Sequence, residues 1–265
     1  MSILSQITPQ LELFLVIFFA LILGSFISLL TYRINSKEPI IWARSKCVKC
    51  NKILGVLNLI PLFSWIFQRG KCSNCKEKIS PRYPLIEFSN LACYLLIYFA
   101  AGSQISFAII LQFLIASTLI VMCVVDLEHY YIPDASQYFL AILVTMLLFN
   151  KGGSDLVIKN APSAFIFLGF GLLLWLYFYF TTGLEAIGVD DIKFFFIIGL
   201  LLGTANFLGF MMLSGVFGIV FGFLWQKLKQ EDTFPFAPSI CCAALITMIF
   251  DKKIDPAELL GMLLF

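Results

Sequence analysis

The sequence predicts an all-α, polytopic membrane protein with about eight transmembrane helices and a small cytoplasmic zinc-binding loop domain. Three observations predict this class. Of the 265 residues, 60% are hydrophobic and 13% are charged, about half the charged share of a soluble domain. The apolar residues form long runs of the kind that cross a bilayer, and 11 of the 18 basic residues lie between the first two runs. This composition excludes a disordered chain, a disulfide-stapled mini-protein and an ordinary cytosolic enzyme.

The first predicted helix covers residues 11–32. No lysine or arginine precedes it, and it is longer than the apolar region of a cleaved signal peptide, so we interpret it as membrane-spanning. Later apolar runs, separated by charged residues, glycine or proline, predict further helices, several of them shorter than the ~20 residues of a full span. These helices cover residues 85–101, 105–126, 136–149, 161–182, 194–211, 212–225 and 236–250. The tail 254–265 is expected to lie along the membrane interface.

The distribution of charge predicts the orientation of the chain. Residues 33–82 carry a net charge of +9 and the rest of the chain −7, which gives the overall +2. Basic loops between spans stay in the cytoplasm, so the N-terminus is expected outside. Counting eight helices from there brings Asp126, Asp190 and Asp191 to the cytoplasmic face. A nucleic-acid-binding patch is the competing interpretation of the basic loop. The loop holds few aromatic residues and adjoins membrane spans, so we expect the lipid bilayer, and no nucleic acid, as a partner.

Four cysteines in the basic loop form two CxxC pairs. The pattern C-x2-C-x21-C-x2-C suits a tetrahedral zinc ion held by four thiolates, a structural site with no open position. Two redox dithiols or two disulfides are the alternative, which a reducing cytoplasm disfavours. The predicted ligands are Cys47, Cys50, Cys72 and Cys75. The other cysteines lie in apolar runs and are expected to pack there, namely Cys93, Cys123, Cys241 and Cys242. We expect three domains, at residues 1–32, 33–84 and 85–265.

Three aspartates at the ends of predicted helices are the strongest candidates for chemistry. Asp126 ends an uncharged apolar run, and Asp190 and Asp191 lie between Gly188 and Lys193, where one helix gives way to the next. Ionisable groups at membrane depth are costly and usually mark a function. Two carboxylates in a partly dry site cannot both ionise easily, so one keeps a proton. Such a pair can activate water and protonate a leaving amine. The alternative is that these acids only mark where helices leave the membrane.

The remaining polar candidates carry less chemistry. His129 is the single histidine, which excludes a two-histidine H-E-x-x-H zinc site, and no G-x-S-x-G context supports a serine triad. We expect an interfacial side chain there, beside Asp126. Asp134 follows a proline and is expected to cap a helix. Glu87, near the start of the second helix, fits either a capping or a substrate-facing acid.

Motifs along the chain resemble those of bacterial type IV prepilin peptidases, the GxGD class of intramembrane aspartic proteases. The four-cysteine loop is similar to the family's cytoplasmic zinc module. Residues 125–134 resemble its first aspartate motif, D-x6-P-D, and residues 188–193 resemble its GxGDxK motif. Further similar segments are Gly24-Ser25-Phe26 with Tyr32-Arg33, residues 60–65, residues 80–87 and residues 235–238. The resemblance covers about residues 20–245.

The resemblance implies a function and assigns roles. It makes Asp126 and Asp191 the catalytic pair of a peptidase domain at residues 85–265, the four cysteines ligands of structural Zn(II), and Lys193 and Gly188 supporting residues. The family cleaves the leaders of type IV prepilins and type II secretion pseudopilins at the cytoplasmic face of the inner membrane. Many members then methylate the new N-terminus with S-adenosylmethionine. The residues that would bind this cofactor are unknown from the sequence, which shows no glycine-rich cofactor loop.

The sequence departs from the family pattern at three positions. Asp190 stands where the second motif has glycine, which makes Asp190 the alternative catalytic residue. Ser28 replaces an asparagine and Ala237 replaces a glycine. Neither of these two changes argues against peptidase activity.

Two other functions compete with a membrane endopeptidase. A polytopic transporter would use the same aspartates as a proton or cation relay, and an assembly scaffold would dock partners through the cysteine loop. A relay needs acids through the depth of the membrane. The predicted gathering of the acids at one face therefore favours the enzyme.

Overall fold

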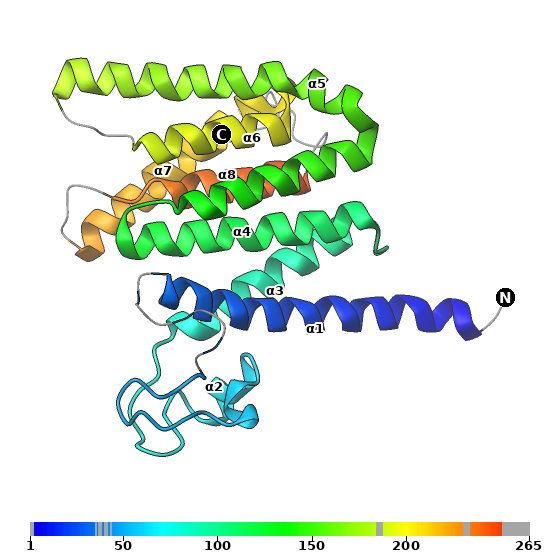
Figure 1. Cartoon of the computed structure of the whole chain (residues 1–265), viewed down its shortest axis with the longest axis vertical. Coiled ribbons are helices and arrows are strands. Elements are labelled where there is room, and N and C mark those ends of the chain that lie inside the picture. The colour runs from blue at the N-terminus through cyan, green and yellow to red at the C-terminus, as the bar shows by residue number, and fades with distance from the viewer. Residues whose placement is uncertain are drawn as a thin grey trace, which may run out of the picture. The chain divides into compact units, whose positions relative to one another are not determined.

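The computed structural model describes residues 3–34, 36, 39, 42, 44–183, 188–229 and 234–250. Over these residues the chain is helical, with eight α-helices, two short 3-10 helices and two isolated β-bridges (Figure 1). It forms two compact units, unit 1 at residues 1–105 and unit 2 at residues 106–265.

Unit 1 is built on two helices, α1 (Ile3–Arg33) and α3 (Arg82–Ala100), which pack against each other. Gly24 of α1 permits the close approach, because a Cβ there would lie 2.9 Å from the Cα of Glu87 on α3. Asn90 is fully buried, and its side-chain amide donates to a carbonyl of α1 at 2.7 Å. The polar group inside this packing is thus satisfied, and the two helices are fixed in register.

Between α1 and α3 the chain forms a small irregular module that contains η1 (Val56–Leu59) and α2 (Phe63–Phe67). Two tight loops flank these elements. An antiparallel bridge closes each loop, from Lys46 to Ile53 in the first and from Lys71 to Lys78 in the second. Each loop carries one CxxC pair, so the module presents the two pairs in matching local structures.

Unit 2 begins with α4 (Phe107–His129) and α5 (Asp134–Thr182). The 49 residues of α5 are interrupted at Gly152 and Gly153, whose backbone is not helical. Gly153 has a φ of +65°, which glycine adopts at little steric cost. The helix turns back on itself at this kink (Figure 1). The interval between the helices predicted at 136–149 and 161–182 therefore contains a kink between two arms of α5.

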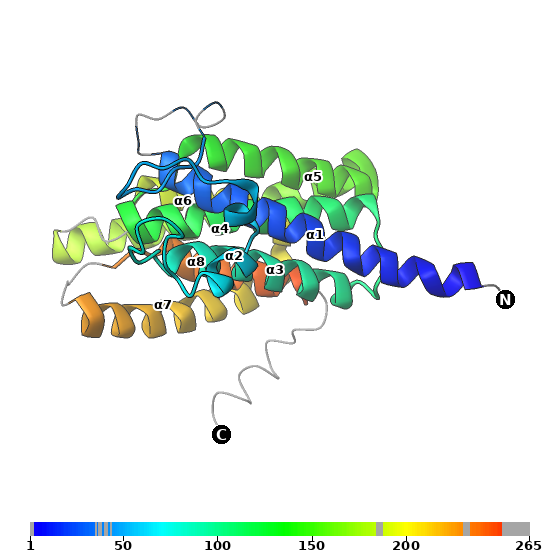
Figure 2. The same cartoon turned by 90° about the horizontal axis from the view of Figure 1, so that it is seen from below.

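Four shorter elements complete unit 2: α6 (Val189–Leu202), η2 (Thr204–Asn206), α7 (Phe207–Lys229) and α8 (Ala237–Ile249). α6 packs against α5, and α8 packs against α4 and α7 (Figure 2). Gly199 of α6 permits the first contact, because a Cβ there would lie 2.7 Å from a backbone oxygen of α5.

The break between α6 and α7 falls at Gly203, earlier than the boundary predicted at residue 212. Gly203 has a φ of +73°, and Asn206 closes the end of α6 by donating its side-chain amide to the Leu202 carbonyl at 2.9 Å. The surrounding run, residues 194–225, holds no charged residue. Hydropathy therefore gives no signal for this break, which depends on a single left-handed glycine.

Five of the described helices are long and apolar enough to cross a membrane, in segments Pro9–Arg33, Arg82–Ala100, Phe107–His129, Asp134–Thr181 and Thr204–Lys229. The all-helical class is confirmed, but the expected count of about eight transmembrane helices is wrong. α2, α6 and α8 have 5, 14 and 13 residues, fewer than the ~20 of a full span. The helices predicted at 136–149 and 161–182 belong to the single, kinked α5.

The structure groups α3 with α1 in unit 1, whereas the predicted division assigns residues 85–265 to one transmembrane domain. The functional division into 1–32, 33–84 and 85–265 stays a prediction. The tail 254–265, expected along the membrane interface, lies outside the described residues.

Candidate functional site

Asp126 places a buried carboxylate near the C-terminal end of α4. The residue is 6% exposed, and Tyr130, with a φ of +58°, ends the helix one turn later. The Asp126 Oδ2 accepts a hydrogen bond from the backbone N–H of Ala237, 3.0 Å away. Ala237 begins α8, and a helix N-terminus carries a partial positive charge. The start of α8 therefore holds one oxygen of this carboxylate, and the other, Oδ1, has no hydrogen-bond partner among the described residues.

Asp191 is held in a similar way in the first turn of α6. Its Oδ2 accepts a hydrogen bond from the backbone N–H of Gly188, the N-cap residue of the helix, at 3.1 Å. The residue is half-buried. A Cβ at Gly188 would lie 3.4 Å from this oxygen, so glycine keeps the space beside the carboxylate open. Here too a helix N-terminus binds Oδ2, and Oδ1 has no hydrogen-bond partner among the described residues.

The two carboxylates lie near one another. Asp126 and Asp191 are close enough to interact electrostatically, and Asp190 interacts with both. The Cys241 thiol on α8 is 2% exposed and lies within electrostatic range of Asp126 and Asp191. The end of α4 and the starts of α5 and α6 lie at the same end of unit 2 (Figure 1). The fold thus gathers the three aspartates singled out from the sequence.

Asp190 has different partners from Asp191. Its Oδ1 pairs with the Lys193 Nζ at 3.1 Å, and the same Nζ pairs with the Asp134 Oδ1 at 2.9 Å. Lys193 thus links the first turns of α5 and α6 through an exposed ion-pair network. The expected capping role of Asp134 is wrong, because Pro133 occupies the N-cap position of α5 and the Asp134 carboxylate faces Lys193 instead. Asp191 stays outside this network.

Gln137 on α5 is a site residue that the sequence analysis missed. It is 2% exposed, and its Nε2 donates to the Asp190 carbonyl at 3.2 Å. This bond holds the peptide that joins Asp190 to Asp191. The Gln137 Oε1 is buried and has no hydrogen-bond partner within the described residues. A single amide in the first turn of a predicted helix, beside Ser136, carries no pattern that would have identified it.

Two further groups at the site were also missed. The Ala237 N–H is a backbone donor, which residue types do not reveal, although the prolines at 235 and 238 marked the segment. Cys241 was expected only to pack among apolar side chains. Its neighbours on other helices become known only from the fold.

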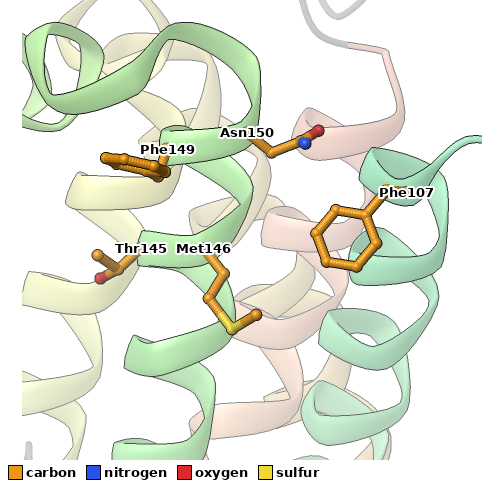
Figure 3. Close-up of a pocket in the computed structure, with 5 residues that line it drawn as sticks. All are labelled: Phe107, Thr145, Met146, Phe149 and Asn150. Atoms are coloured by element: carbon orange, nitrogen blue, oxygen red, sulfur yellow. The ribbon is translucent and has the colours of Figure 1, made fainter.

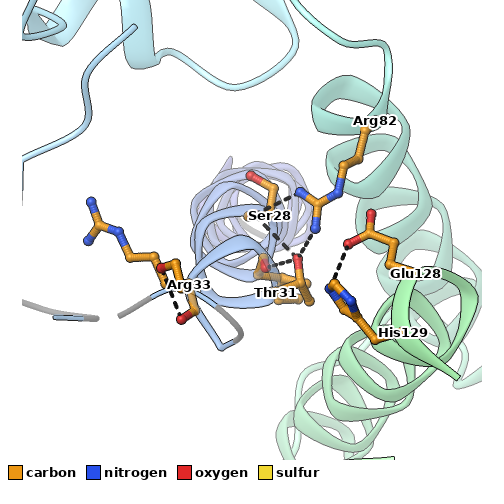
Figure 4. Close-up of polar contacts among 8 residues, drawn as sticks. Ser28, Thr31, Arg33, Arg82, Glu128 and His129 are labelled. Atoms are coloured by element: carbon orange, nitrogen blue, oxygen red, sulfur yellow. Dashed lines mark hydrogen bonds and ion pairs between the residues drawn. The ribbon is translucent and has the colours of Figure 1, made fainter. Parts of the chain in front are cut away.

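His129 does not join the aspartates through any hydrogen bond in the described part of the chain. Its Nε2 lies 4.0 Å from the Glu128 Oε2 (Figure 4), and its ring centroid lies 6.4 Å from that of Tyr131. Its side chain is 38% exposed. These contacts are those of a polar residue at the end of α4.

The four predicted zinc ligands of unit 1 come together. The Sγ atoms of Cys47, Cys50, Cys72 and Cys75 all lie within 4.8 Å of one another, and all four thiols are free. Thiolates held at ~2.3 Å from a tetrahedral zinc ion are about 3.8 Å apart, and the Sγ atoms of Cys47 and Cys75 are 3.8 Å apart. The cluster therefore fits a metal ion, and the alternative of two disulfides is not what the structure contains.

The four thiols share their protons unequally: against a backbone hydrogen bond from Glu77 that lowers the pKa of Cys75, burial and the neighbouring thiols raise this pKa to about 11, and backbone hydrogen bonds lower the pKa of two others. The N–H groups of Cys75 and Asn74 lower the pKa of the Cys72 thiol to about 6. The N–H of Lys52 lowers the pKa of the Cys50 thiol. Thiolates are the form that binds zinc. The loops that carry the CxxC pairs thus supply the donors as well as the ligands.

A cavity of about 490 Å³ lies within unit 1, between the end of α1, the cysteine module and the start of α3. Its wall includes Glu87, which is 7% exposed and whose Oε2 accepts the Leu62 N–H at 2.7 Å. Arg82 at the start of α3 donates to the Ser28 carbonyl at 3.1 Å and to the Thr31 hydroxyl at 2.8 Å (Figure 4). This cavity, which we call the module cavity, combines acidic, basic and aromatic side chains.

A second cavity, of about 290 Å³, lies in unit 2 and is much less polar. It is lined by side chains from the start of α4 and the first arm of α5 (Figure 3), namely Phe107, Thr145, Met146, Phe149 and Asn150. None of these residues is charged. Among the described residues, the cavity therefore offers hydrogen bonds from Thr145 and Asn150 but no ion-pair partner for a charged ligand.

Two family models match the chain. One, described as the bacterial peptidase A24 N-terminal domain, matches residues 18–101, and the other, the type IV leader peptidase family, matches residues 113–223. The matches fall one in each structural unit. No solved structure matches the chain.

Curated relatives are similar over nearly the whole chain. A prepilin leader peptidase/N-methyltransferase of Bacillus subtilis is 32% identical, over 89% of this chain and 93% of its own length. Its counterpart in Pectobacterium carotovorum is 28% identical, over 87% and 90%. A type 4 prepilin-like proteins leader peptide-processing enzyme of Escherichia coli is 25% identical, over 86% and 90%.

Proposed function

This chain belongs to the type IV leader peptidase family, and on that premise we propose that it cleaves the leader peptides of type IV prepilins or pseudopilins and then N-methylates the new N-terminus. The observation that carries the cleavage step is the convergence of Asp126 and Asp191, each tied by one oxygen to a helix N-terminus. The protein is a bacterial multi-pass membrane enzyme.

The geometry supports a shared water between the two aspartates. Because backbone N–H groups occupy the Oδ2 atoms of Asp126 and Asp191, the two Oδ1 atoms are the ones available to a water molecule. Two neighbouring carboxyls in a poorly solvated site share one proton. One is then a base and the other an acid, which is the combination that peptide hydrolysis needs.

Cleavage follows from this division of roles. The ionised aspartate takes a proton from water as the water oxygen bonds to the scissile carbonyl carbon, and the protonated aspartate donates its proton to the carbonyl oxygen. When the resulting gem-diol collapses, the C–N bond breaks, and the nitrogen of the pilin leaves as an amine after accepting a proton. The leader departs as a carboxylic acid, and the aspartates return to sharing one proton.

Asp191 suits the catalytic role better than Asp190. The Lys193 ammonium holds the Asp190 carboxylate and would compete with water for it. Asp191 is free of this ion pair and interacts with Asp126. We therefore assign Asp190 and Lys193 to fixing the first turn of α6 against α5, with Gly188 supplying the N–H that orients Asp191.

The cysteine cluster is proposed to hold a structural Zn(II), since four thiolates fill a tetrahedral site. The basic loop is proposed to lie in the cytoplasm with the N-terminus outside, because residues 33–82 carry +9 and basic loops are retained there. For the second reaction, S-adenosylmethionine supplies a methyl group. The amine of the cleaved pilin forms an N–C bond as the S–C bond breaks, sulfur keeps the bonding pair, and the amine loses one proton.

The experiment that tests cleavage uses isosteric variants of the full chain in proteoliposomes with a prepilin substrate. Asp126→Asn and Asp191→Asn keep an acceptor for the backbone N–H groups but remove the acid–base pair, so cleavage should fall by about 10² to 10⁴-fold. Asp155→Asn on the exposed second arm of α5 is the matched control and should cleave normally. If Asp190→Asn lost as much activity and Asp191→Asn retained it, the catalytic residue would be Asp190. Full activity of Asp126→Asn would overturn the mechanism.

A further inference from the structure

The cysteine module of unit 1 carries an uncharged, apolar segment between its two CxxC loops. Residues 53–68, which we call the apolar turn, hold no charged side chain, although residues 33–82 around them hold 11 basic ones. Lys52 and Arg69 flank the turn directly, and η1 and α2 lie within it. The turn is shorter than the ~20 residues of a full span, and apolar runs of this kind form either core or interfacial segments.

The side chains of the apolar turn are too exposed to form a core. None of the residues of η1 and α2, all of which the structure describes, is buried. Contiguous exposed apolar side chains mark a surface that contacts a partner or a membrane. Six apolar side chains of the turn are more than half exposed, namely Ile53, Val56, Leu57, Phe63, Ile66 and Phe67.

A hydrogen bond fixes the level of the apolar turn along the two long helices of unit 1. The Leu62 N–H donates to the Glu87 Oε2 at 2.7 Å. Glu87 lies five residues inside α3, about 7 Å from its start, and packs against Gly24, about 13 Å before the end of α1. α2 therefore lies beside the C-terminal part of α1 and not beyond its end (Figure 1, Figure 2). Since α1 and α3 are both candidate spans, the turn lies at the level of the membrane.

The backbone of the apolar turn is suited to this level. Irregular backbone at membrane depth needs partners within the protein. Leu62 has a φ of +61° and a ψ of −54°, which a non-glycine residue rarely adopts, and Glu87 accepts its N–H. The N–H groups at positions 64 and 66 donate to carbonyls one turn earlier, at 3.0 and 3.1 Å. The Trp65 indole N–H donates to a carbonyl of the module at 3.2 Å. These donors need no water.

We propose that the apolar turn inserts into the cytoplasmic leaflet of an anionic bilayer, with Lys52 and Arg69 at the level of the headgroups. Both flanking side chains are exposed, and a basic residue near an anionic membrane strengthens binding by about fivefold. Apolar side chains between basic ones are the composition of interfacial segments. The turn then gives the cysteine module a third attachment to the membrane, besides α1 and α3. The choice of leaflet rests on the orientation proposed above.

The apolar part of a prepilin is the other occupant that such a surface would fit. The contact between Leu62 and Glu87 favours lipid, because it holds the turn beside the spans whether or not a substrate is present.

The test uses the full chain in nanodiscs of phosphatidylglycerol and phosphatidylcholine that contain a phospholipid with a diazirine in its acyl chain. Ultraviolet light converts the diazirine to a carbene, and the labelled peptides are identified by mass spectrometry. The apolar turn of the wild type should be labelled, with the α1 segment Pro9–Arg33 as the reference for contact with lipid. An unlabelled turn beside a labelled α1 would overturn the proposal.

The variants separate insertion from folding. Phe67→Asp should lower labelling of the turn by about 10-fold, since it removes a buried aromatic side chain from the bilayer and adds a charge, while Phe67→Leu should be labelled as the wild type is. Val48→Asp is the matched control, because Val48 is also an exposed apolar side chain of the module but lies outside the turn. Zinc content shows that each variant is folded. Equal loss of labelling in Val48→Asp and Phe67→Asp would overturn the assignment to this turn.

Two further outcomes test the choice of partner. In nanodiscs of phosphatidylcholine alone, labelling of the turn should fall by about 3- to 10-fold, and equal labelling in both lipids would overturn the role given to Lys52 and Arg69. If the turn were unlabelled without substrate but cross-linked to a prepilin that carries a photoreactive residue in its apolar part, the surface would belong to the substrate and the proposal would fail.

The labelling is independent of the proposed function, because the nanodiscs contain no prepilin and expose both faces of the bilayer. An enzyme that cleaves prepilin with an unlabelled turn would refute this inference alone. A labelled turn in a protein that does not cleave would refute the proposed function alone.

Discussion

The buried carboxylates of the two units differ in their neighbours. In unit 2, Asp126 and Asp191 lie within electrostatic range of each other, and each is held by one backbone N–H at a helix N-terminus. In unit 1, Glu87 is held by a backbone N–H from a strained loop and has no second carboxylate or cation beside it among the described residues. Two acids that share a proton perform acid–base chemistry, whereas Glu87 has no second carboxyl with which to share one and is held by hydrogen bonds from Leu62 and Ser25.

The largest expected effect tests whether the two aspartates act as one unit. The double variant Asp126→Asn/Asp191→Asn should cleave no more slowly than either single variant, about 10² to 10⁴-fold below the wild type, because residues that work together are not additive. Single-turnover cleavage of a prepilin in proteoliposomes measures this. A double variant whose loss equals the product of the two single losses would mean that the aspartates act independently, and the contrast with Glu87 would disappear.

The second effect concerns the metal of unit 1. Cys72→Ser removes one of four thiolates and should reduce bound zinc, measured by elemental analysis of the purified chain, to well below one ion per protein. Because the metal holds the two loops of the module together, the melting temperature should fall with the zinc content. Cys93→Ser is the control, since Cys93 lies on α3 outside the cluster. An unchanged zinc content in Cys72→Ser would contradict a site made of all four thiolates.

The third effect compares the close helix contacts of the two units. An added Cβ at Gly24 would lie 2.9 Å from the Glu87 backbone, and one at Gly199 would lie 2.7 Å from a backbone oxygen of α5. Gly24→Ala and Gly199→Ala should each cost about 1–3 kcal/mol of stability. Gly169→Ala has open space and should be neutral or stabilising by up to about 1 kcal/mol. Thermal unfolding in nanodiscs gives the order of the three variants. A Gly169→Ala variant as unstable as the others would refute the packing argument.

Much of unit 1 was predictable from residue types. Two CxxC pairs at the right spacing predict a four-cysteine cluster because the ligands themselves carry the signal, and the structure contains that cluster. The role of Glu87 was left open, since the sequence does not show that Leu62, 25 residues away, donates its N–H to this carboxylate. Nor does the sequence reveal a cavity.

In unit 2 the sequence identified the candidate aspartates but not the number and boundaries of the helices. Asp126, Asp190 and Asp191 stood out because acids are rare in apolar runs, and the fold gathers them. The count of spans failed, because hydropathy measures neither a kink such as that at Gly153 nor a break such as that at Gly203. The backbone donors that orient the aspartates come from residues 188 and 237, and no residue-type pattern identifies a backbone donor.

The smallest expected effect sharpens the account of how unit 2 holds its second aspartate. Gln137 donates from α5 to the Asp190 carbonyl of α6, and Asn160 makes the same kind of bond, from α5 to the Leu200 carbonyl of α6 at 3.0 Å. Gln137→Leu and Asn160→Leu therefore each remove one bond between these helices, worth about 0.5–1.5 kcal/mol, and should lower the melting temperature by similar amounts.

Only the Gln137 bond adjoins Asp191, so only Gln137→Leu should lower kcat for cleavage, by about 3- to 10-fold, with KM unchanged. A rise in KM without a change in kcat would instead assign Gln137 to substrate binding. Equal kcat in both variants would show that the Asp190 peptide is fixed without Gln137. The ion pair of Lys193 with Asp190 would then be sufficient to hold Asp191 beside Asp126.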